Sequence, residues 1–188
     1  MNWKSYVAEL EGCLHGLKVS DRSGSPLDPE EGFLRLFHCT EKARTDKATV
    51  FFVGNGASAS IASHMAADMN KNGKVRTEVF TDLALITAVA NDIGFDQVYA
   101  EPLRRKMNAV DALLAISSSG NSQNILNAVD TARELGGFVI TLSGMRPDNA
   151  LRAFGDLNFY VPAATYGLAE SAHATLLHHW IDRIVAAQ

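Results

Sequence analysis

The spacing of apolar residues predicts two helices at the start of the chain. Apolar side chains recur every three or four positions through residues 3–17 and again through 33–43. Asp28 followed by Pro29 is typical of a helix N-cap and first turn, and the polar segment 20–29 is expected to be a loop. Two helices should therefore precede the first strand.

From Thr49 onward, short continuous apolar runs alternate with helical stretches. Strands that are apolar on both faces indicate a parallel sheet with helices on either side. The expected strands are 50–53, 75–80, 112–116, 138–142 and 157–161, and the expected helices are 58–72, 97–108, 122–135 and 168–187. We predict a single α/β domain over residues 1–188, with helices in 1–47 and the core in 48–188.

The last expected helix is apolar around most of its circumference, from Leu168 to Val185. A helix of this kind must be buried on several sides. We favour burial against another subunit, which would make it the interface helix of a homo-oligomer. A central helix packed inside the monomer is the alternative.

Composition and charge argue against several classes of protein. The chain has 188 residues, 47% of them hydrophobic, which is typical of a packed globular domain. A net charge of −4 without a basic run argues against a nucleic acid or an acidic membrane as partner. Two cysteines, together with the lack of a signal-peptide pattern or an apolar run of about 18 residues, indicate a soluble cytoplasmic protein.

Two strand-to-helix junctions have the composition of anion-binding loops. Segment 54–58 (GNGAS) brings glycines and a helix N-terminus together, but it lacks the P-loop lysine and the full dinucleotide fingerprint, so no nucleotide cofactor is expected. Segment 117–122 (SSSGNS) adds four hydroxyls, and such neutral donors can hold a phosphate monoester. Helix capping by Ser122 would account for one serine but not for all four.

Both loops should lie at the carboxyl edge of the sheet, where ligands bind in open α/β folds. Between them in the sequence, Asn91 and Asp92 form a polar break after an apolar helical stretch. This pair could hydrogen-bond sugar hydroxyls, or it could form a turn or a cap.

Several segments together, in this order and spacing, resemble the SIS (sugar isomerase) domain family, and within it the phosphoheptose isomerases. They are FFVGNGASASIASHMAADM, AVANDIGF, LLAISSSGNSQNILNA, GGFVITLSG and AESAHATLLHHWI, and the similarity extends over essentially the whole chain. The resemblance implies a flavodoxin-like three-layer αβα sandwich, usually a homotetramer with active sites at subunit contacts. It also implies conversion of sedoheptulose 7-phosphate to D-glycero-D-manno-heptose 7-phosphate for surface polysaccharides.

The resemblance also assigns substrate-binding positions in the two loops and the polar break. In this sequence they are Asn55, Gly56, Ser58, Asp92, Ser117, Ser118, Ser119 and Ser122, and Glu170 on the last helix is a further substrate-binding position. The catalytic positions differ more from the family pattern. Where the family has a histidine and, four residues later, a glutamate base, this chain has His64 and Asp68. Where the family has a glutamine and, eight residues later, a catalytic histidine, this chain has Glu170 and His178.

Aldose–ketose interconversion through an enediol needs a base and an acid, for which we expect Asp68 and His178. His64 and Asp68 lie at i and i+4 on one helix face, and with Glu170 and His178 they form a set that suits one Zn²⁺ per site, as in some relatives. Because Glu170 and His178 are separated by about 12 Å of helical rise, they could share an ion only through converging side chains. A structural hydrogen bond between His64 and Asp68 is the alternative.

Two hypotheses about function follow. The first is a phosphosugar isomerase of the phosphoheptose type, although the loops would also accept another ketose phosphate. The second is a noncatalytic SIS module that senses a sugar phosphate or binds a protein partner. Asp68 motivates it, because aspartate is one methylene shorter than glutamate and a misplacement of about 1 Å can cost about a hundredfold in rate.

Overall fold

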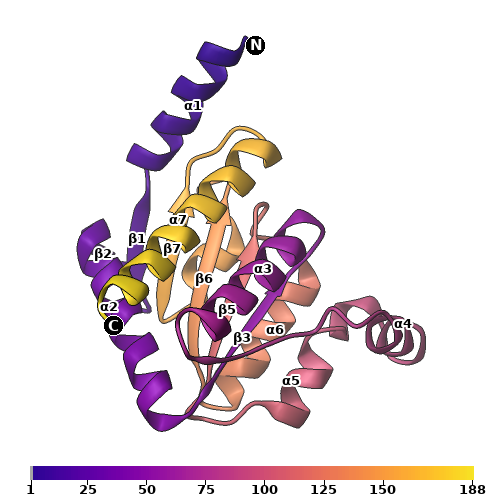
Figure 1. Ribbon diagram of the computed structural model, residues 1–188. Helices are drawn as coiled ribbons and strands as arrows, with labels where there is room; N and C mark the ends of the chain where they lie inside the picture. The colour runs from indigo at the N-terminus through magenta and orange to yellow at the C-terminus, as the bar shows by residue number, and fades with distance from the viewer. Residues whose placement is uncertain (1) are drawn as a thin grey trace.

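A computed structural model describes residues 2–188 and contains a seven-stranded sheet with helices on both faces (Figure 1). The strands are β1 (Lys18–Asp21), β2 (Pro26–Leu27), β3 (Thr49–Gly54), β4 (Arg76–Val79), β5 (Ala112–Ser117), β6 (Phe138–Gly144) and β7 (Leu157–Val161). The helices are α1 (Trp3–His15), α2 (Pro29–Asp46), α3 (Ala57–Lys71), α4 (Leu83–Asp92), α5 (Ala100–Lys106), α6 (Gln123–Glu134) and α7 (Tyr166–Ala186), with 3-10 turns η1 (Phe95–Gln97) and η2 (Ala150–Ala153).

The sheet has the order β2-β1-β7-β6-β5-β3-β4. Its five strands from β3 to β7 are parallel and follow the flavodoxin-like order, which confirms the predicted αβα sandwich. The chain reverses its direction of winding between β3 and β5, where Gly54 pairs with Ile116 at the carboxyl ends. The loops that follow these two strands therefore lie side by side at the switch point of the sheet.

The segment between the first two helices differs from the prediction, because it forms a hairpin instead of a loop. The Asp21 carboxylate accepts hydrogen bonds from the N–H groups of Ser23 and Ser25 in the turn, and β1 pairs antiparallel with β7. The expectation that no strand precedes Thr49 is therefore wrong. Only Val19 of β1 is buried, so the strand has no apolar run that would identify it.

Helix α7 lies on the same face of the sheet as α3 (Figure 1) and also contacts α1 and α2. Most of its apolar residues are buried within this chain, although Tyr166 and Val185 are exposed, and Trp180 donates a hydrogen bond from Nε1 to Thr40 Oγ1 of α2 at 2.9 Å. Packing inside one chain thus accounts for most of the apolar pattern of α7. A role of α7 at a subunit interface stays a prediction.

Two other helices extend away from the rest of the molecule (Figure 1). Helix α1 leaves Trp3 76% exposed, and α4 leaves Leu83 75% exposed. Apolar side chains this open to solvent are uncommon in such number on one chain. Within residues 2–188, no helix combines the length and the apolar character needed to cross a membrane.

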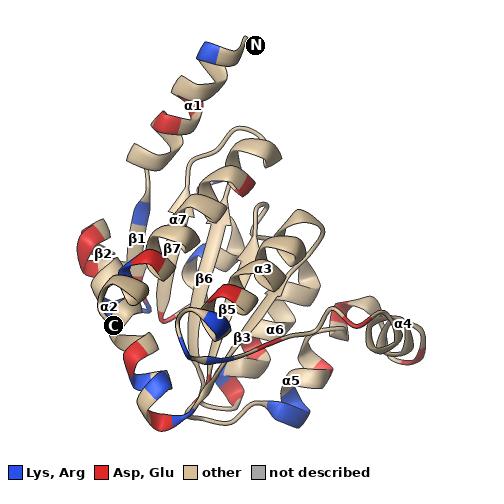
Figure 2. Cartoon of the chain, in the orientation of Figure 1, with Lys and Arg blue, Asp and Glu red and all other residues tan. Residues whose placement is uncertain are grey.

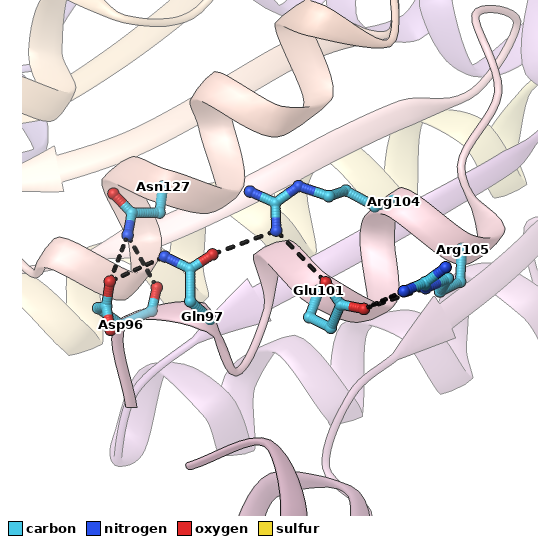
Figure 3. A network of polar contacts seen from close by, with 6 residues as sticks. All are labelled: Asp96, Gln97, Glu101, Arg104, Arg105 and Asn127. Atoms are coloured by element: carbon cyan, nitrogen blue, oxygen red, sulfur yellow. Dashed lines mark hydrogen bonds and ion pairs between the residues drawn. The ribbon is translucent and has the colours of Figure 1, made fainter. Parts of the chain in front are cut away.

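A polar network holds the segment that follows α4 (Figure 3). Asn127 of α6 donates to the backbone oxygen of Asp96 in η1 at 3.0 Å, and Gln97 donates to the Asp96 carboxylate at 2.8 Å. Arg104 links Gln97 to Glu101 within α5, at 3.2 and 3.4 Å. The network thus fixes η1 against α5 and α6 while α4 itself remains exposed.

Candidate functional site

The first loop joins β3 to α3 and has a glycine at the end of the strand and another at the N-cap of the helix. A Cβ on Gly54 would lie 2.7 Å from the backbone of Ser58, so only glycine allows the strand end to approach the helix start. Gly56 has φ +55° and is the N-cap of α3, where no side chain caps the helix. The N–H groups of Ser58 and Ala59 donate to the backbone oxygens of Asn55 and Gly56 at 3.0 Å. This helix start therefore attracts an anion mainly through the positive end of the helix dipole.

The serine loop joins β5 to α6, and its hydroxyls face one another. Ser117 Oγ accepts a hydrogen bond from the N–H of Gly120 at 3.2 Å and lies 3.4 Å from Ser122 Oγ and 3.5 Å from Ser119 Oγ. Ser122 is the N-cap of α6, but its hydroxyl makes no capping hydrogen bond. Capping therefore does not explain its side chain, which is directed toward the other serines.

An amide pair that the sequence did not reveal joins the two loops. Asn55 and Asn124 exchange two hydrogen bonds, Nδ2 to Oδ1 in each direction, at 2.9 and 2.8 Å. Asn124 is buried in the first turn of α6, so the pair ties the start of that helix to the first loop. Buried Tyr99 supports the same loop through a hydrogen bond to the backbone oxygen of Gly54.

These two loops and the start of α7 enclose a pocket of about 320 Å³, here called the serine pocket. Its lining includes Asn55, Gly56, Ser58, Ser117, Ser118, Ser119, Ser122 and Glu170, all predicted as site residues, and also Tyr166, which was not. Lys and Arg are absent from the loops after β3 and β5, and several gather near the lower ends of α2, α3 and α5 (Figure 2). The serine pocket thus offers hydroxyls and N–H groups in place of cations.

A second group of predicted residues lies on the two helices that start at this pocket. His64 and Asp68 of α3 and His178 of α7 each offer a ligand atom, and these atoms all lie within 4.8 Å of one another. His64 Nε2 and Asp68 Oδ2 are 3.5 Å apart, which is longer than an ordinary hydrogen bond, and the imidazole of His64 is exposed. The His64 and His178 rings lie 5.4 Å apart between centroids. We call these three residues the His–Asp–His cluster.

Two predicted residues are not part of this cluster. Glu170 lies two turns before His178 on α7 and lines the serine pocket. Asp92 is exposed at the end of α4, where its carboxylate accepts a hydrogen bond from Asn91 at 2.8 Å, and it does not line the serine pocket. The chain thus places Glu170 beside the phosphate-binding loops and leaves Asp92 on the extended helix α4.

The geometry of the His–Asp–His cluster fits a zinc ion. Two neutral imidazoles and a carboxylate are ordinary zinc ligands, and a tetrahedral ion holds its ligand atoms about 3.4 Å apart. The 3.5 Å between His64 and Asp68 matches that spacing. Exposed side chains can also adjust by the small rotations that closer approach to an ion would need.

Beneath the serine loop, α7 contributes a fully buried histidine. His173 Nε2 donates to the backbone oxygen of Ser143 at 3.1 Å, and Ser143 pairs with Ser117 across the sheet. Burial lowers the pKa of His173 from 6.5 to about 4, although the hydrogen bond to Ser143 opposes this. His173 is therefore neutral at physiological pH and supports the sheet end that carries the serines.

Comparison with known proteins gives consistent matches across the chain. Residues 31–144 match the SIS domain family. The chain is 31% identical over 161 residues to the phosphoheptose isomerase of Helicobacter pylori, covering 82% of this chain and 83% of that protein. It is 34% identical over 137 residues to that of Campylobacter concisus, covering 69% and 71%.

A solved structure agrees with these matches. The phosphoheptose isomerase of Neisseria gonorrhoeae aligns with a TM-score of 0.82 and 28% identity over 96% of each chain. Together with the similarity in sequence, this extends the likeness to α1 and α7, outside the segment matched by the family. The chain therefore belongs to the SIS domain family, and its relatives there include phosphoheptose isomerases.

Proposed function

We propose that this protein is a phosphoheptose isomerase that interconverts sedoheptulose 7-phosphate and D-glycero-D-manno-heptose 7-phosphate. The observation that carries the proposal is that α3 and α7 both begin at the serine pocket and together bear the His–Asp–His cluster. A phosphate site at the helix starts and acid–base groups farther along the same helices suit a long sugar phosphate. The names of the relatives in two bacterial species support the same reaction.

In this proposal, the serine pocket holds the phosphate. The hydroxyls of Ser117, Ser119 and Ser122 donate hydrogen bonds to its oxygens, and the positive end of the α3 helix dipole attracts its charge. Ser58 and Ser118 are buried at the same loops and complete the wall. The site has no lysine or arginine, so it binds the phosphate through hydrogen bonds from neutral groups. Such a site can release the sugar phosphate again after turnover.

We assign the chemistry to Asp68 and His178. Asp68 takes the proton from C1 of the ketose while His178 donates a proton to the carbonyl oxygen at C2, which gives the enediol. His178 then recovers a proton from the hydroxyl at C1, and Asp68 returns its proton to C2. Glu170, at the serine pocket, is placed to hydrogen-bond the sugar, and Asp92 would have to reach it from α4.

We further propose that His64, Asp68 and His178 hold a zinc ion, with Glu170 as a predicted fourth ligand. With zinc bound, the ion would polarise the sugar oxygens at the reacting carbons in place of proton donation by His178, because a zinc-bound imidazole is neutral and a poor acid. A carboxylate has two oxygens, so Asp68 can bind through one and keep the other for the proton. His64 and His178 are exposed in the single chain. In the proposed assembly, the surface of a neighbouring subunit would enclose the cluster.

The same proposal includes assembly into a homotetramer in the cytoplasm, where the product would supply heptose for surface polysaccharides. The exposed apolar side chains of α1 and α4, such as Trp3 and Leu83, support the assembly because another copy would cover them. A tetramer would also bring a neighbour's α4, with Asp92, toward a site. Besides the zinc ion, sugar phosphate is the ligand class that we assign to this site.

A noncatalytic phosphosugar sensor is the second candidate, and Asp68 is the observation that favours it. An aspartate in place of the family's glutamate sets the base one methylene farther from the sugar. The 3.5 Å approach of His64 to Asp68 favours the enzyme instead, since it keeps the carboxylate within the cluster.

Isomerisation of sedoheptulose 7-phosphate by zinc-loaded protein separates the two candidates. An isomerase gives product, and Asp68→Ala should lower turnover by at least about a hundredfold while the affinity for the sugar phosphate is kept. Glu134→Ala, an exposed acid at the end of α6, is the matched control. Folded wild-type protein that binds the sugar phosphate without converting it would support the sensor and exclude the isomerase.

A further inference from the structure

A second pocket lies between the β1–β2 hairpin and η2. One wall comes from residues 17–27 and the other from residues 147–153. Its volume of about 530 Å³ is within the range of sites for small organic ligands. It shares no lining residue with the serine pocket. We call it the hairpin pocket.

Two cations of the hairpin pocket are gathered around one aromatic ring. Lys18 of β1 pairs in register with Tyr160 of β7, so their side chains lie on the same face of the sheet. The guanidinium carbon of Arg152 in η2 lies over the same ring, 4.2 Å from its centre. The Tyr160 hydroxyl donates to the backbone oxygen of Met145 at 2.7 Å, which holds the ring in place. The fold thus brings both positive charges to Tyr160.

Neither of these cations has a carboxylate partner within residues 2–188. Arg152 donates from one Nη nitrogen to the backbone oxygen of Pro147, a bond that uses neither Nε nor the second Nη nitrogen. Two like charges beside one ring repel each other, and a bound anion would remove that repulsion. Lys18 and Arg152 are therefore available to a ligand.

The acidic residue of the hairpin pocket is already paired. Asp148 lines the pocket, and Arg146 donates to its two carboxylate oxygens at 3.0 and 2.9 Å. With Lys18 and Arg152, these side chains carry three positive charges and one negative charge, in a chain whose net charge is −4. The lining therefore favours an anion.

Apolar surface lies beside the two cations. Leu17 and Leu27 are half-buried, and both line the pocket together with Pro26. A planar guanidinium can donate two parallel hydrogen bonds to a phosphate, and the ammonium of Lys18 adds a point charge. A ligand that matches the whole lining thus combines a phosphate group with a small apolar group.

We propose that the hairpin pocket binds a small organic phosphate monoester. The phosphate contacts Lys18 and Arg152, and the apolar part of the ligand packs against Leu17 and Leu27. This site depends on charge, whereas the serine pocket holds no lysine or arginine. Binding here does not need the isomerase activity, so either proposal can fail without the other.

Calorimetric titration with phenyl phosphate, which has a phosphate and an apolar ring but no sugar hydroxyls, tests this site. The wild-type protein should bind it, and Lys18→Glu should bind at least about tenfold more weakly, because repulsion replaces a charge-assisted hydrogen bond. Lys4→Glu makes the same charge change at the start of α1, outside the pocket, and should leave the affinity unchanged. Both lysines are exposed, and an unchanged melting temperature will show that both variants fold.

Two further arms identify the place and the chemistry of binding. Ser119→Ala should keep the binding that depends on Lys18, and inorganic phosphate should bind more weakly than phenyl phosphate. The proposal is overturned if millimolar phenyl phosphate gives no binding heat or if Lys18→Glu binds as the wild type does. It is equally overturned if Ser119→Ala abolishes the binding, because the ligand would then occupy the serine pocket. Equal affinity for inorganic phosphate would exclude a site for a monoester.

Discussion

At the scale of single residues, the proposed phosphate site consists of neutral groups whose positions are fixed by the loop. Gly120 adopts φ +66°, and a Cβ there would collide with the side chain of Asn149, so the turn is held in one shape. That shape brings the hydroxyls of Ser117, Ser119 and Ser122 together. In this proposal each hydroxyl binds the phosphate through a directed hydrogen bond, because a neutral group adds little long-range electrostatic attraction.

Replacement of one of these hydroxyls should weaken substrate binding. We expect Ser119→Ala to raise KM by about tenfold to a hundredfold, because a hydrogen bond to a charged group contributes about 1.5–3 kcal/mol. Ser60→Ala, an exposed serine on α3 outside the serine pocket, is the matched control and should leave KM unchanged. Steady-state kinetics measures both, and an unchanged KM in Ser119→Ala would remove this serine from the phosphate site.

Buried His173 gives the protein a characteristic dependence of stability on pH. Below pH 6.5 the unfolded chain takes up a proton at this residue that the folded chain accepts only near pH 4. The free energy of unfolding should therefore fall as the pH is lowered through this window, by about 1.4 kcal/mol per unit and about 3 kcal/mol in total. Urea unfolding at several pH values measures this fall, and His173→Gln should flatten it. The same slope in wild type and variant would assign the effect to other groups.

At the scale of elements, the site depends on how α3 and α6 are joined at their starts. The amide pair between Asn55 and Asn124 connects two loops that are 69 residues apart in the sequence. We expect Asn124→Ala to destabilise the fold by about 1–3 kcal/mol, because it leaves the Asn55 amide without its partner. It should also weaken phosphosugar binding, since the first loop loses its anchor.

Thermal unfolding and phosphosugar titration measure these two effects. Gln123→Ala is the control, because Gln123 lies in the same turn of α6 but is exposed to solvent. If Asn124→Ala lowers stability and leaves affinity unchanged, the amide pair supports the fold without positioning the loop.

Sequence reasoning predicted the elements whose pattern is local. The central strands stand out because β5 and β7 are buried at every position, and the serines stand out because four hydroxyls occur within six residues. The hairpin at β1, with one buried residue, carries no such pattern. Asn124 was missed for another reason, since its role depends on a partner, Asn55, that only the folded chain brings near.

At the scale of the whole molecule, the proposed sugar-phosphate site lies at the carboxyl edge of the sheet and on the two helices that start there. The switch point between β3 and β5 unites the two loops, and α3 and α7 extend from it to the His–Asp–His cluster. The resemblance in sequence identified both groups of residues.

The central claim is that Asp68 moves a proton between two carbons of sedoheptulose 7-phosphate. The most direct measurement is nuclear magnetic resonance of the reaction of the zinc-loaded wild-type protein in deuterium oxide. We expect conversion to the heptose 7-phosphate with deuterium at C2, because the proton held by Asp68 exchanges with solvent before it returns. No conversion by folded protein, or a product in which C2 carries only the hydrogen that was on C1 of the ketose, would contradict the account.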